Sequence, residues 1–290
     1  MSGADLLFNL RNFFHLGAFQ AAINEASDLT ALSGSEALER DFLVYRSYVA
    51  LGSLELVISE IGNDAPMGLL AVRLLAQYLS SSVPQDKVLE TLSEWMADPV
   101  TNSNPMVCLI AGTIHCHEEN YVEALKSCHS GATLEMMSLC VQVYLLMNRP
   151  DKAEEQVKAM SQVDDDATIT QLSTAWTGLA LGGAKVQDAF HIFQELGDRH
   201  QWTGLLHNGS GVCNMRMDQY EDAERDLLDA LNKDANNPTT LANLIACELH
   251  LGKPVSRYVS QLKMTDPGHI IVKEAEAAEG EFDKAASAFS

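Results

Sequence analysis

Histidine and cysteine side chains gather in two short segments that are the nearest approach to a metal site in this sequence. The first holds His115, Cys116 and His117, and the second holds Cys128 and His129. A zinc site needs ligand pairs that converge from fixed spacings such as C-x2-C or H-x3-H, and neither spacing occurs here. On a helix, His115 and His117 would also point nearly opposite ways. We therefore interpret these residues as packing residues with partial exposure and predict no metal site.

Four further segments resemble catalytic or ligand-binding motifs, but each lacks an essential part. Residues 117–119 (His-Glu-Glu) lack the second histidine of a zinc-protease helix, because Tyr121 stands in its place. Residues 181–185 (Leu-Gly-Gly-Ala-Lys) lack the spaced glycine and the hydroxyl of a phosphate-binding loop. Residues 209–211 lack the outer glycines of a nucleophile elbow, and residues 164–166 lack the glycine and distal glutamate of a calcium loop. The sequence therefore predicts no catalytic residue, no cofactor and no enzyme.

The composition favours a protein partner over nucleic acid or lipid. With 19 basic and 40 acidic side chains the formal charge is −21, and this field repels phosphate backbones and anionic headgroups. The six cysteines are scattered, which in a long helical chain indicates a reducing compartment. No signal peptide is expected, and the richest apolar run, residues 136–147, is too short to span a bilayer. We expect a cytoplasmic protein.

The elements that carry these residues are marked by a phrase that recurs along the chain, in which an aromatic residue is followed three positions later by alanine. The four copies are Phe19 and Ala22, Tyr121 and Ala124, Tyr220 and Ala223, and Phe282 and Ala285. The phrase resembles the turn and second-helix opening of a tetratricopeptide (TPR) hairpin, whose period is about 34 residues. It predicts an all-α fold, an α-solenoid of TPR-like helical hairpins curled into a superhelix. We expect one array over residues 1–290 with eight to nine hairpins, of which residues 264–290 form the last.

Small or apolar residues at the alanine position set the register of the remaining repeats. Ala189 and Ala223 are separated by one repeat length of 34 residues, and Ala153 marks another copy. Four positions after each anchor comes a second packing residue, such as Phe193, on the same face of the helix. The predicted packing residues are Phe19, Ala22, Tyr121, Ala124, Ala153, Ala189, Phe193, Tyr220, Ala223, Phe282 and Ala285.

The same register points one face of each first helix toward the concave side of the array, where we expect a partner to bind. The predicted partner-binding residues are Leu7, Arg11, Phe14, Phe42, Arg46, Val49, Arg73, Leu145, Asn208, Val212 and Met215. This wall is largely apolar, which suits burial of an apolar partner segment. Three arginines (11, 46 and 73) should stack on it. They either receive a carboxylate or backbone carbonyls of the partner, or pair internally with acids such as Glu36, Glu39 or Asp41.

Several phrases go beyond the generic repeat and resemble the epsilon subunit family of coatomer, the coat of COPI vesicles. They are residues 7–12, 17–26, 39–41, 45–46, 165–172, 174–176, 187–190, 192–195, 243–245, 250–254 and 257–263. The segment after Lys263 is less similar to the family.

The resemblance implies a non-enzymatic scaffold subunit that clasps the C-terminal region of the coatomer alpha subunit in its concave groove. It further implies the rest of the coatomer complex as partners, and a place on Golgi membranes and COPI-coated vesicles reached only indirectly through the coat. The transport steps implied are retrograde Golgi-to-ER and intra-Golgi. The alternative is a free cytosolic TPR adaptor or co-chaperone that binds a peptide segment.

Overall fold

The described chain consists of helices joined by turns and short loops. The computed structural model describes residues 5–131 and 133–288, and these contain α-helices, one short 3-10 helix and no strand. They lie in two compact units, one ending at Leu181 and the other beginning at Gly182. Each unit is described by itself below. The all-α prediction is confirmed, and a single array over residues 1–290 stays a prediction.

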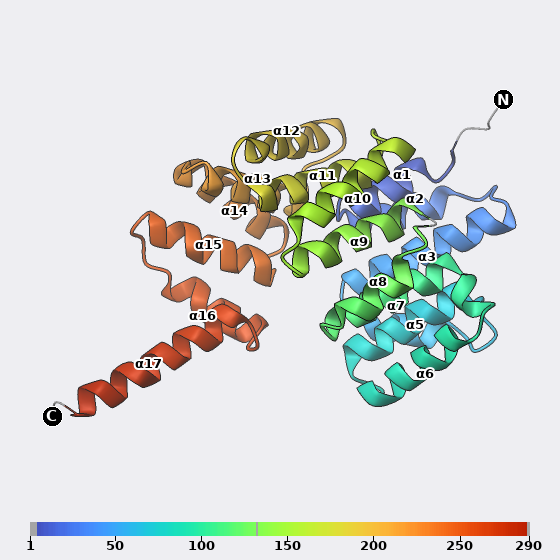
Figure 1. Cartoon of the computed structure of the whole chain (residues 1–290), viewed down its shortest axis with the longest axis horizontal. Coiled ribbons are helices and arrows are strands. Elements are labelled where there is room, and N and C mark those ends of the chain that lie inside the picture. The colour runs from blue at the N-terminus through green and yellow to red at the C-terminus, as the bar shows by residue number, and fades with distance from the viewer. Residues whose placement is uncertain (1–4, 132, 289–290) are drawn as a thin grey trace. The chain divides into compact units, whose positions relative to one another are not determined.

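The N-terminal unit holds eleven α-helices within its described residues (Figure 1). They are α1 (Phe8–His15), α2 (Phe19–Asp28), α3 (Gly34–Ala50), α4 (Leu54–Glu60), α5 (Met67–Ser80), α6 (Gln85–Ala97), α7 (Pro105–His117), α8 (Tyr121–Cys128), α9 (Leu134–Leu146), α10 (Pro150–Val163) and α11 (Thr168–Leu181), with the 3-10 helix η1 (Thr101–Ser103) before α7. The odd-numbered members are the first helices of successive hairpins, and the even-numbered members are the second helices.

The C-terminal unit continues the same alternation. Its helices are α12 (Ala184–Arg199), α13 (Gly204–Arg216), α14 (Tyr220–Lys233), α15 (Pro238–His250), α16 (Ser256–Thr265) and α17 (Ile270–Ala288). Pro238 occupies the first turn of α15, where its missing N–H costs no hydrogen bond. Residues 264–290 were expected to form a hairpin, but the described part of that segment from Ile270 onward is one continuous helix.

Local sequence explains where the hairpins start and turn. Side chains of Ser33, Asn104 and Thr133 accept hydrogen bonds from the first free N–H groups of α3, α7 and α9, so each of these helices starts at a capping residue. Between the helices of a hairpin, the chain reverses through a residue with positive φ, such as Gly17 (78°) or Gly52 (77°). Glycine adopts this conformation without steric cost, which keeps these turns short.

The core is built where second helices cross first helices. The anchor residues Ala22, Ala124, Ala153 and Ala223 are all 0% exposed, and Ala189 is 1% exposed. An added Cβ on Gly211 of α13 would lie 2.8 Å from Leu227 Cγ and 3.4 Å from the carbonyl oxygen of Ala223 on α14, so the backbones approach closely. Small residues on both helices therefore set the crossing distance within the hairpin.

One predicted packing pair differs in the structure. Phe282 is 71% exposed and Ala285 is also exposed, because both lie in the second half of α17 rather than at the opening of a second helix. An aromatic residue followed three positions later by alanine also occurs on any helix with an apolar stripe, because residues three apart share a face. The spacing alone therefore did not distinguish a repeat from an amphipathic helix.

Candidate functional site

The N-terminal unit encloses a cavity of about 570 Å³ on the inner side of its first helices. Helices α1 and α3 form one part of its wall, and the N-terminal turns of α7, α9 and α11 with the residues just before them form the rest. The lining residues are Asp5, Phe8, Arg11, Asn12, His15, Leu38, Glu39, Phe42, Leu43, Asn104, Pro105, Met106, Leu109, Thr133, Leu134, Glu135, Asp164, Ala167, Thr168 and Ile169. The unit thus offers a partly apolar recess with charged groups on its wall.

The cavity exists because the unit curls far enough to bring its last helix against its first. Helix α11 packs against α1, and Thr168 Oγ1 donates a hydrogen bond of 2.7 Å to Asn12 Oδ1. Both residues are buried, at 5% and 7% exposure, so this polar contact is shielded from water. A hydrogen bond in such surroundings is costly to break because its donor and acceptor would be left without partners.

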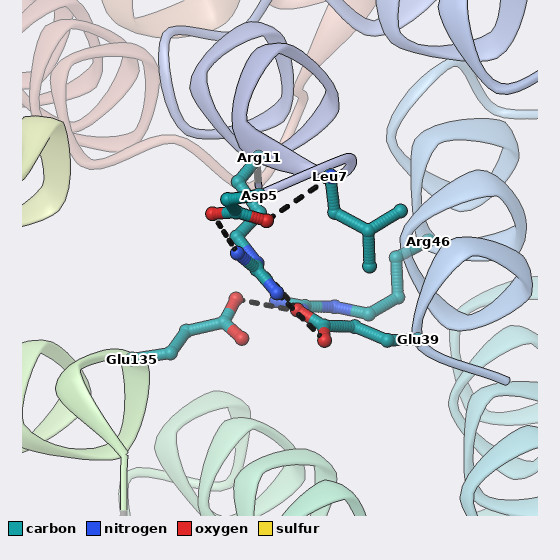
Figure 2. A network of polar contacts seen from close by, with 6 residues as sticks. All are labelled: Asp5, Leu7, Arg11, Glu39, Arg46 and Glu135. Carbon is teal, nitrogen blue, oxygen red and sulfur yellow. Dashed lines mark hydrogen bonds and ion pairs between the residues drawn. The ribbon is translucent and has the colours of Figure 1, made fainter. Parts of the chain in front are cut away.

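Arg46 of α3 crosses the inner side of the unit to meet α1 and α9. Its Nη1 atom lies 2.6 Å from Glu135 Oε1, and the two side chains are only 16% and 22% exposed (Figure 2). The guanidinium carbon lies 4.5 Å from the ring centre of Phe14 and 4.9 Å from that of Phe42. A planar guanidinium can stack on aromatic faces while it pairs with a carboxylate, which is a combination that lysine does not offer.

Arg11 of α1 forms a second ion-pair cluster on the same wall. Its Nε and Nη2 atoms donate to the two oxygens of Glu39 on α3, at 2.6 and 2.9 Å, and Nη1 donates to Asp5 Oδ2 at 2.7 Å (Figure 2). The other Asp5 oxygen accepts from the backbone N–H of Leu7 at 3.1 Å, where α1 begins. The bidentate geometry fixes the angle at which α1 meets α3.

Burial and ion pairing shift the pKa values of three residues on this wall. Burial alone would raise the pKa of Glu135, but the charge of the Arg46 guanidinium and the hydrogen bond that it donates hold this pKa below its ordinary value. Burial lowers the pKa of His15, whose neighbours include Glu135, Arg46, Arg11 and Glu39. Hydrogen bonding to Glu39 raises the pKa of Arg11. Arg11 and Arg46 are therefore paired within the chain, beside a histidine whose charged form is disfavoured by burial.

The inner arginines are engaged within the chain. Arg11 pairs with Glu39, one of the acids considered from sequence, whereas Arg46 pairs with Glu135, which was not considered. Arg73 does not join them, contrary to the predicted stack of three. Its Nη1 atom donates to the carbonyl oxygen of Ile61 at 2.7 Å and to Asn63 Oδ1 at 2.9 Å. Because α4 ends at Glu60, the Ile61 carbonyl at its C-terminus is free to attract a cation.

The other predicted partner-binding residues of this unit lie deeper than expected. Leu7 is 1% and Phe42 is 3% exposed, so both act as core residues, although Phe42 also reaches the cavity wall. Val49 and Leu145 are partly buried against neighbouring core clusters. Of the predicted set, Arg11 and Phe42 line the cavity.

In the C-terminal unit, the predicted partner-binding residues belong to α13. Asn208 Oδ1 accepts a hydrogen bond of 3.0 Å from Asn243 Nδ2 on α15, which ties two successive first helices together. Met215 packs against the core cluster of α13, α14 and α15, and Val212 is partly exposed. This face is partly polar and partly apolar.

The segments that resembled catalytic or metal motifs lie in packing or capping positions. Ser210 lies within α13, and its Oγ atom donates to Asp226 Oδ2 at 2.7 Å. Asp164 Oδ1 accepts from the N–H groups of Asp166 and Ala167, both at 3.1 Å, just before α11. Cys128 is fully buried beside Gly112. Within residues 5–131 and 133–288, no three His, Cys, Asp or Glu side chains converge as metal ligands would.

Sequence reasoning missed Asn12, Glu135 and Thr168, which close the unit. Each lies on the inner side of a first helix but far along the chain from its partner. Asn12 and Thr168 are 156 positions apart, and Arg46 and Glu135 are 89 positions apart. The available signal was charge, since Glu135 is an acid in the first turn of a first helix and could complement an inward arginine. The curvature that brings the two together is not a local property.

A model of the coatomer epsilon subunit family matches residues 3–290 of this sequence. The chain belongs to the coatomer epsilon subunit family. It is 51% identical over 290 residues to coatomer subunit epsilon-1 of Arabidopsis thaliana, covering all of this chain and 99% of that one. It is 52% identical to coatomer subunit epsilon-1 of Oryza sativa subsp. japonica and 31% identical to coatomer subunit epsilon of Caenorhabditis elegans, with at least 98% of each chain covered.

Solved structures show the same architecture for this epsilon-family chain. The Cut9–Hcn1 hetero-tetramer of the APC/C has a TM-score of 0.63 at 15% identity, covering 94% of this chain and 56% of that one. A tetratricopeptide repeat protein from Parabacteroides merdae has a TM-score of 0.61 at 11% identity, covering 93% and 95%. The predicted α-solenoid of TPR-like hairpins is confirmed. Membership of this family identifies the chain as a COPI coat subunit.

No helix within the described ranges of this epsilon-family chain is both long and apolar enough to cross a bilayer.

Proposed function

We propose that this coat subunit clasps the C-terminal region of the coatomer alpha subunit, and that the cavity of its N-terminal unit receives part of that region. The observation that carries the proposal is a recess of about 570 Å³ built from the inner faces of the first helices. TPR-like solenoids bind partners on surfaces of this kind, because stacking repeats creates an extended concave face.

The lining indicates what the recess accepts. Phe8 is 56% exposed at its wall, and Met106, Leu109 and Ile169 add further apolar surface. Apolar surface of this kind marks interaction sites.

Charge adds a further requirement on the partner segment. Arg11 is already matched by two carboxylates and Arg46 by one, so an incoming carboxylate would compete with acids that are already in place. Asp164 adds another acid to the lining. The recess therefore favours an apolar segment that carries neutral or basic groups.

The test is a binding titration with the C-terminal domain of the alpha subunit. Phe8→Asp places a charge on the exposed apolar wall and should weaken binding by about tenfold or more, the size typical of a central interface residue. Val122→Asp is the matched control, because Val122 is 58% exposed on α8 and does not line the cavity. Failure of the unmodified chain to bind, or equal losses in both variants, would contradict the proposal.

We also propose that the chain resides in the cytoplasm and reaches Golgi membranes and COPI-coated vesicles through the coat, where it supports retrograde Golgi-to-ER and intra-Golgi transport. The net charge of −21 supports indirect attachment, because an acidic chain is repelled by anionic lipid. Depleting the alpha subunit should release a fluorescently labelled chain from Golgi membranes. Labelled chain that stays on the membranes after depletion would oppose this proposal.

The alternative function, a free adaptor that binds acidic peptide ends, has less support. Such adaptors need unpaired cationic groups on the inner wall. The inner arginines are paired with Glu39 and Glu135, and Asn208 is bonded to Asn243.

A further inference from the structure

Helix α17 extends well beyond the helix on which it packs. It has 19 residues where α16 has 10, a difference of about 13 Å in length at 1.5 Å per residue. Only its beginning is anchored. Val272 is 2% exposed in a cluster with Leu262 and Ile245, and Lys263 Nζ pairs with Glu276 Oε1 at 2.6 Å. From Glu276 to Ala288 no side chain is buried, and Figure 1 shows the helix projecting from α16.

The projecting part keeps an apolar stripe of its own. Apolar residues recur at alternating intervals of four and three, at Ile271, Ala275, Ala278, Phe282 and Ala285. This is the spacing of a seam between two packed helices. Ile271 at the start of the stripe packs against the α15–α16 core, whereas Phe282 near its end is 71% exposed. The same face of α17 therefore packs against α15 and α16 at its start and is exposed to solvent farther along the helix.

This exposure is unusual for a helix of a repeat array. Such a helix normally buries its apolar stripe against a neighbouring repeat. An aromatic residue exposed to this degree within a helical seam is typical of the anchor of an interaction surface.

Acidic side chains border the stripe and limit what can cover it. With Ala275, Ala278, Phe282 and Ala285 in the seam, three of the four positions that flank it are glutamates, at 274, 279 and 281. A second copy of α17 would set these glutamates against one another, which is unfavourable. A helix with lysine or arginine at its flanking positions would pair with them instead.

We propose that the exposed half of α17 docks a helix of another protein whose apolar stripe is flanked by lysine and arginine side chains. Phe282 is the aromatic anchor, and Glu274, Glu279 and Glu281 select the partner by charge. The contact is small, so the binding is of the weak and reversible class. The proposal depends only on α17 and on no feature of the cavity, so it stands or falls separately from binding of the alpha subunit.

The experiment uses the full chain and two designed helical peptides of about three heptads. Both carry leucine in the seam, and one has lysine and the other glutamate at every flanking position. Fluorescence anisotropy with labelled peptide should show the lysine peptide binding at least about tenfold more tightly than the glutamate peptide. Equal binding of the two peptides overturns the proposal.

Variants on α17 assign the binding to the stripe. Phe282→Asp and Glu281→Lys should each lower affinity for the lysine peptide by about tenfold. Asp283→Lys is the matched control, because it makes the same charge change two positions away and outside the seam and its flanks. A loss in the control as large as in Glu281→Lys overturns the proposal. So does a dimer of the chain in sedimentation that Phe282→Asp dissociates, because a second copy would then be the occupant.

Discussion

Arg46 joins three helices of the N-terminal unit through one side chain. It lies on α3, stacks on Phe14 of α1 and Phe42 of its own helix, and pairs with Glu135 of α9. Exposed ion pairs contribute little to stability, because water and salt screen them. This pair is mostly shielded, so the loss of either partner leaves the other charge poorly solvated.

Arg46→Ala should therefore lower the free energy of unfolding of the N-terminal unit by about 2–3 kcal/mol. Urea unfolding of the full chain, with amide exchange followed in α9, measures this change. Arg149→Ala, which breaks an exposed pair with Asp151, should produce no measurable change. If Arg46→Ala also unfolds as the unmodified chain does, the pair has no role in closing the unit.

The burial of His15 should make the N-terminal unit sensitive to mild acid. Its pKa is lowered in the folded state, so its contribution to stability is complete above the unfolded pKa of about 6.5 and declines as the pH falls below that value. The Glu135 pKa is also lowered, but that contribution is lost only below about pH 4.5. His15→Asn should thus flatten the decline in stability between neutral pH and pH 5.

Urea unfolding at several pH values measures this slope, and NMR titration of the His15 ring reports its pKa directly. The pKa values of His115, His200 and His207 are lowered by burial as well, so His15→Asn removes only part of the slope. His191→Asn, on the exposed side of α12, serves as the control. A ring that titrates at or above pH 6.5 in the folded chain would contradict the prediction.

At the scale of the element, the sequence predicted helices well and their long-range contacts poorly. Ala22, Ala124 and Ala223 are buried at helix crossings, because only a small side chain allows two backbones to approach and the requirement recurs with each repeat. No local sequence pattern pointed to Glu135, because its contact with Arg46 depends on the combined curvature of the repeats between them. Phe282 and Ala285 have the spacing of the repeat but are not buried at a helix crossing. The same spacing occurs on any helix with an apolar face.

The close crossing of α13 and α14 provides a test of this packing. An alanine at position 211 would place its Cβ 2.8 Å from Leu227 Cγ, which lies in the core and cannot easily move. Gly211→Ala should therefore destabilise the C-terminal unit by about 1–3 kcal/mol. Gly280→Ala on α17 meets nothing within 4 Å and should instead stabilise its helix by about 0.5–1 kcal/mol. Thermal unfolding followed by circular dichroism measures both, and equal shifts would show that the crossing is not tightly packed.

At the scale of the whole molecule, the N-terminal unit contains all of its own closing contacts. Asn12 with Thr168 and Arg46 with Glu135 both lie before Leu181, where the unit ends. A compact unit with its own core is expected to fold independently. The C-terminal unit has separate core clusters around α13–α17.

A fragment of residues 1–181 should therefore be helical and unfold in one cooperative transition. A second fragment, residues 1–163, lacks α11 and with it the Asn12–Thr168 bond, and should melt roughly 5 °C or more below the first. Circular dichroism during heating compares the two. An unfolded 1–181 fragment, or identical melting of both, would contradict the independence of the unit.

The contact between α1 and α11 also has a consequence for synthesis of the chain. A repeat array can fold hairpin by hairpin as it leaves the ribosome, but this unit cannot close until Thr168 follows Asn12 out, 156 residues later. At about 5–20 residues per second, the inner wall stays open for roughly ten to thirty seconds. During that interval the recess is open on the side that α11 later covers, so a partner that enters before release of the chain would not have to open the finished unit.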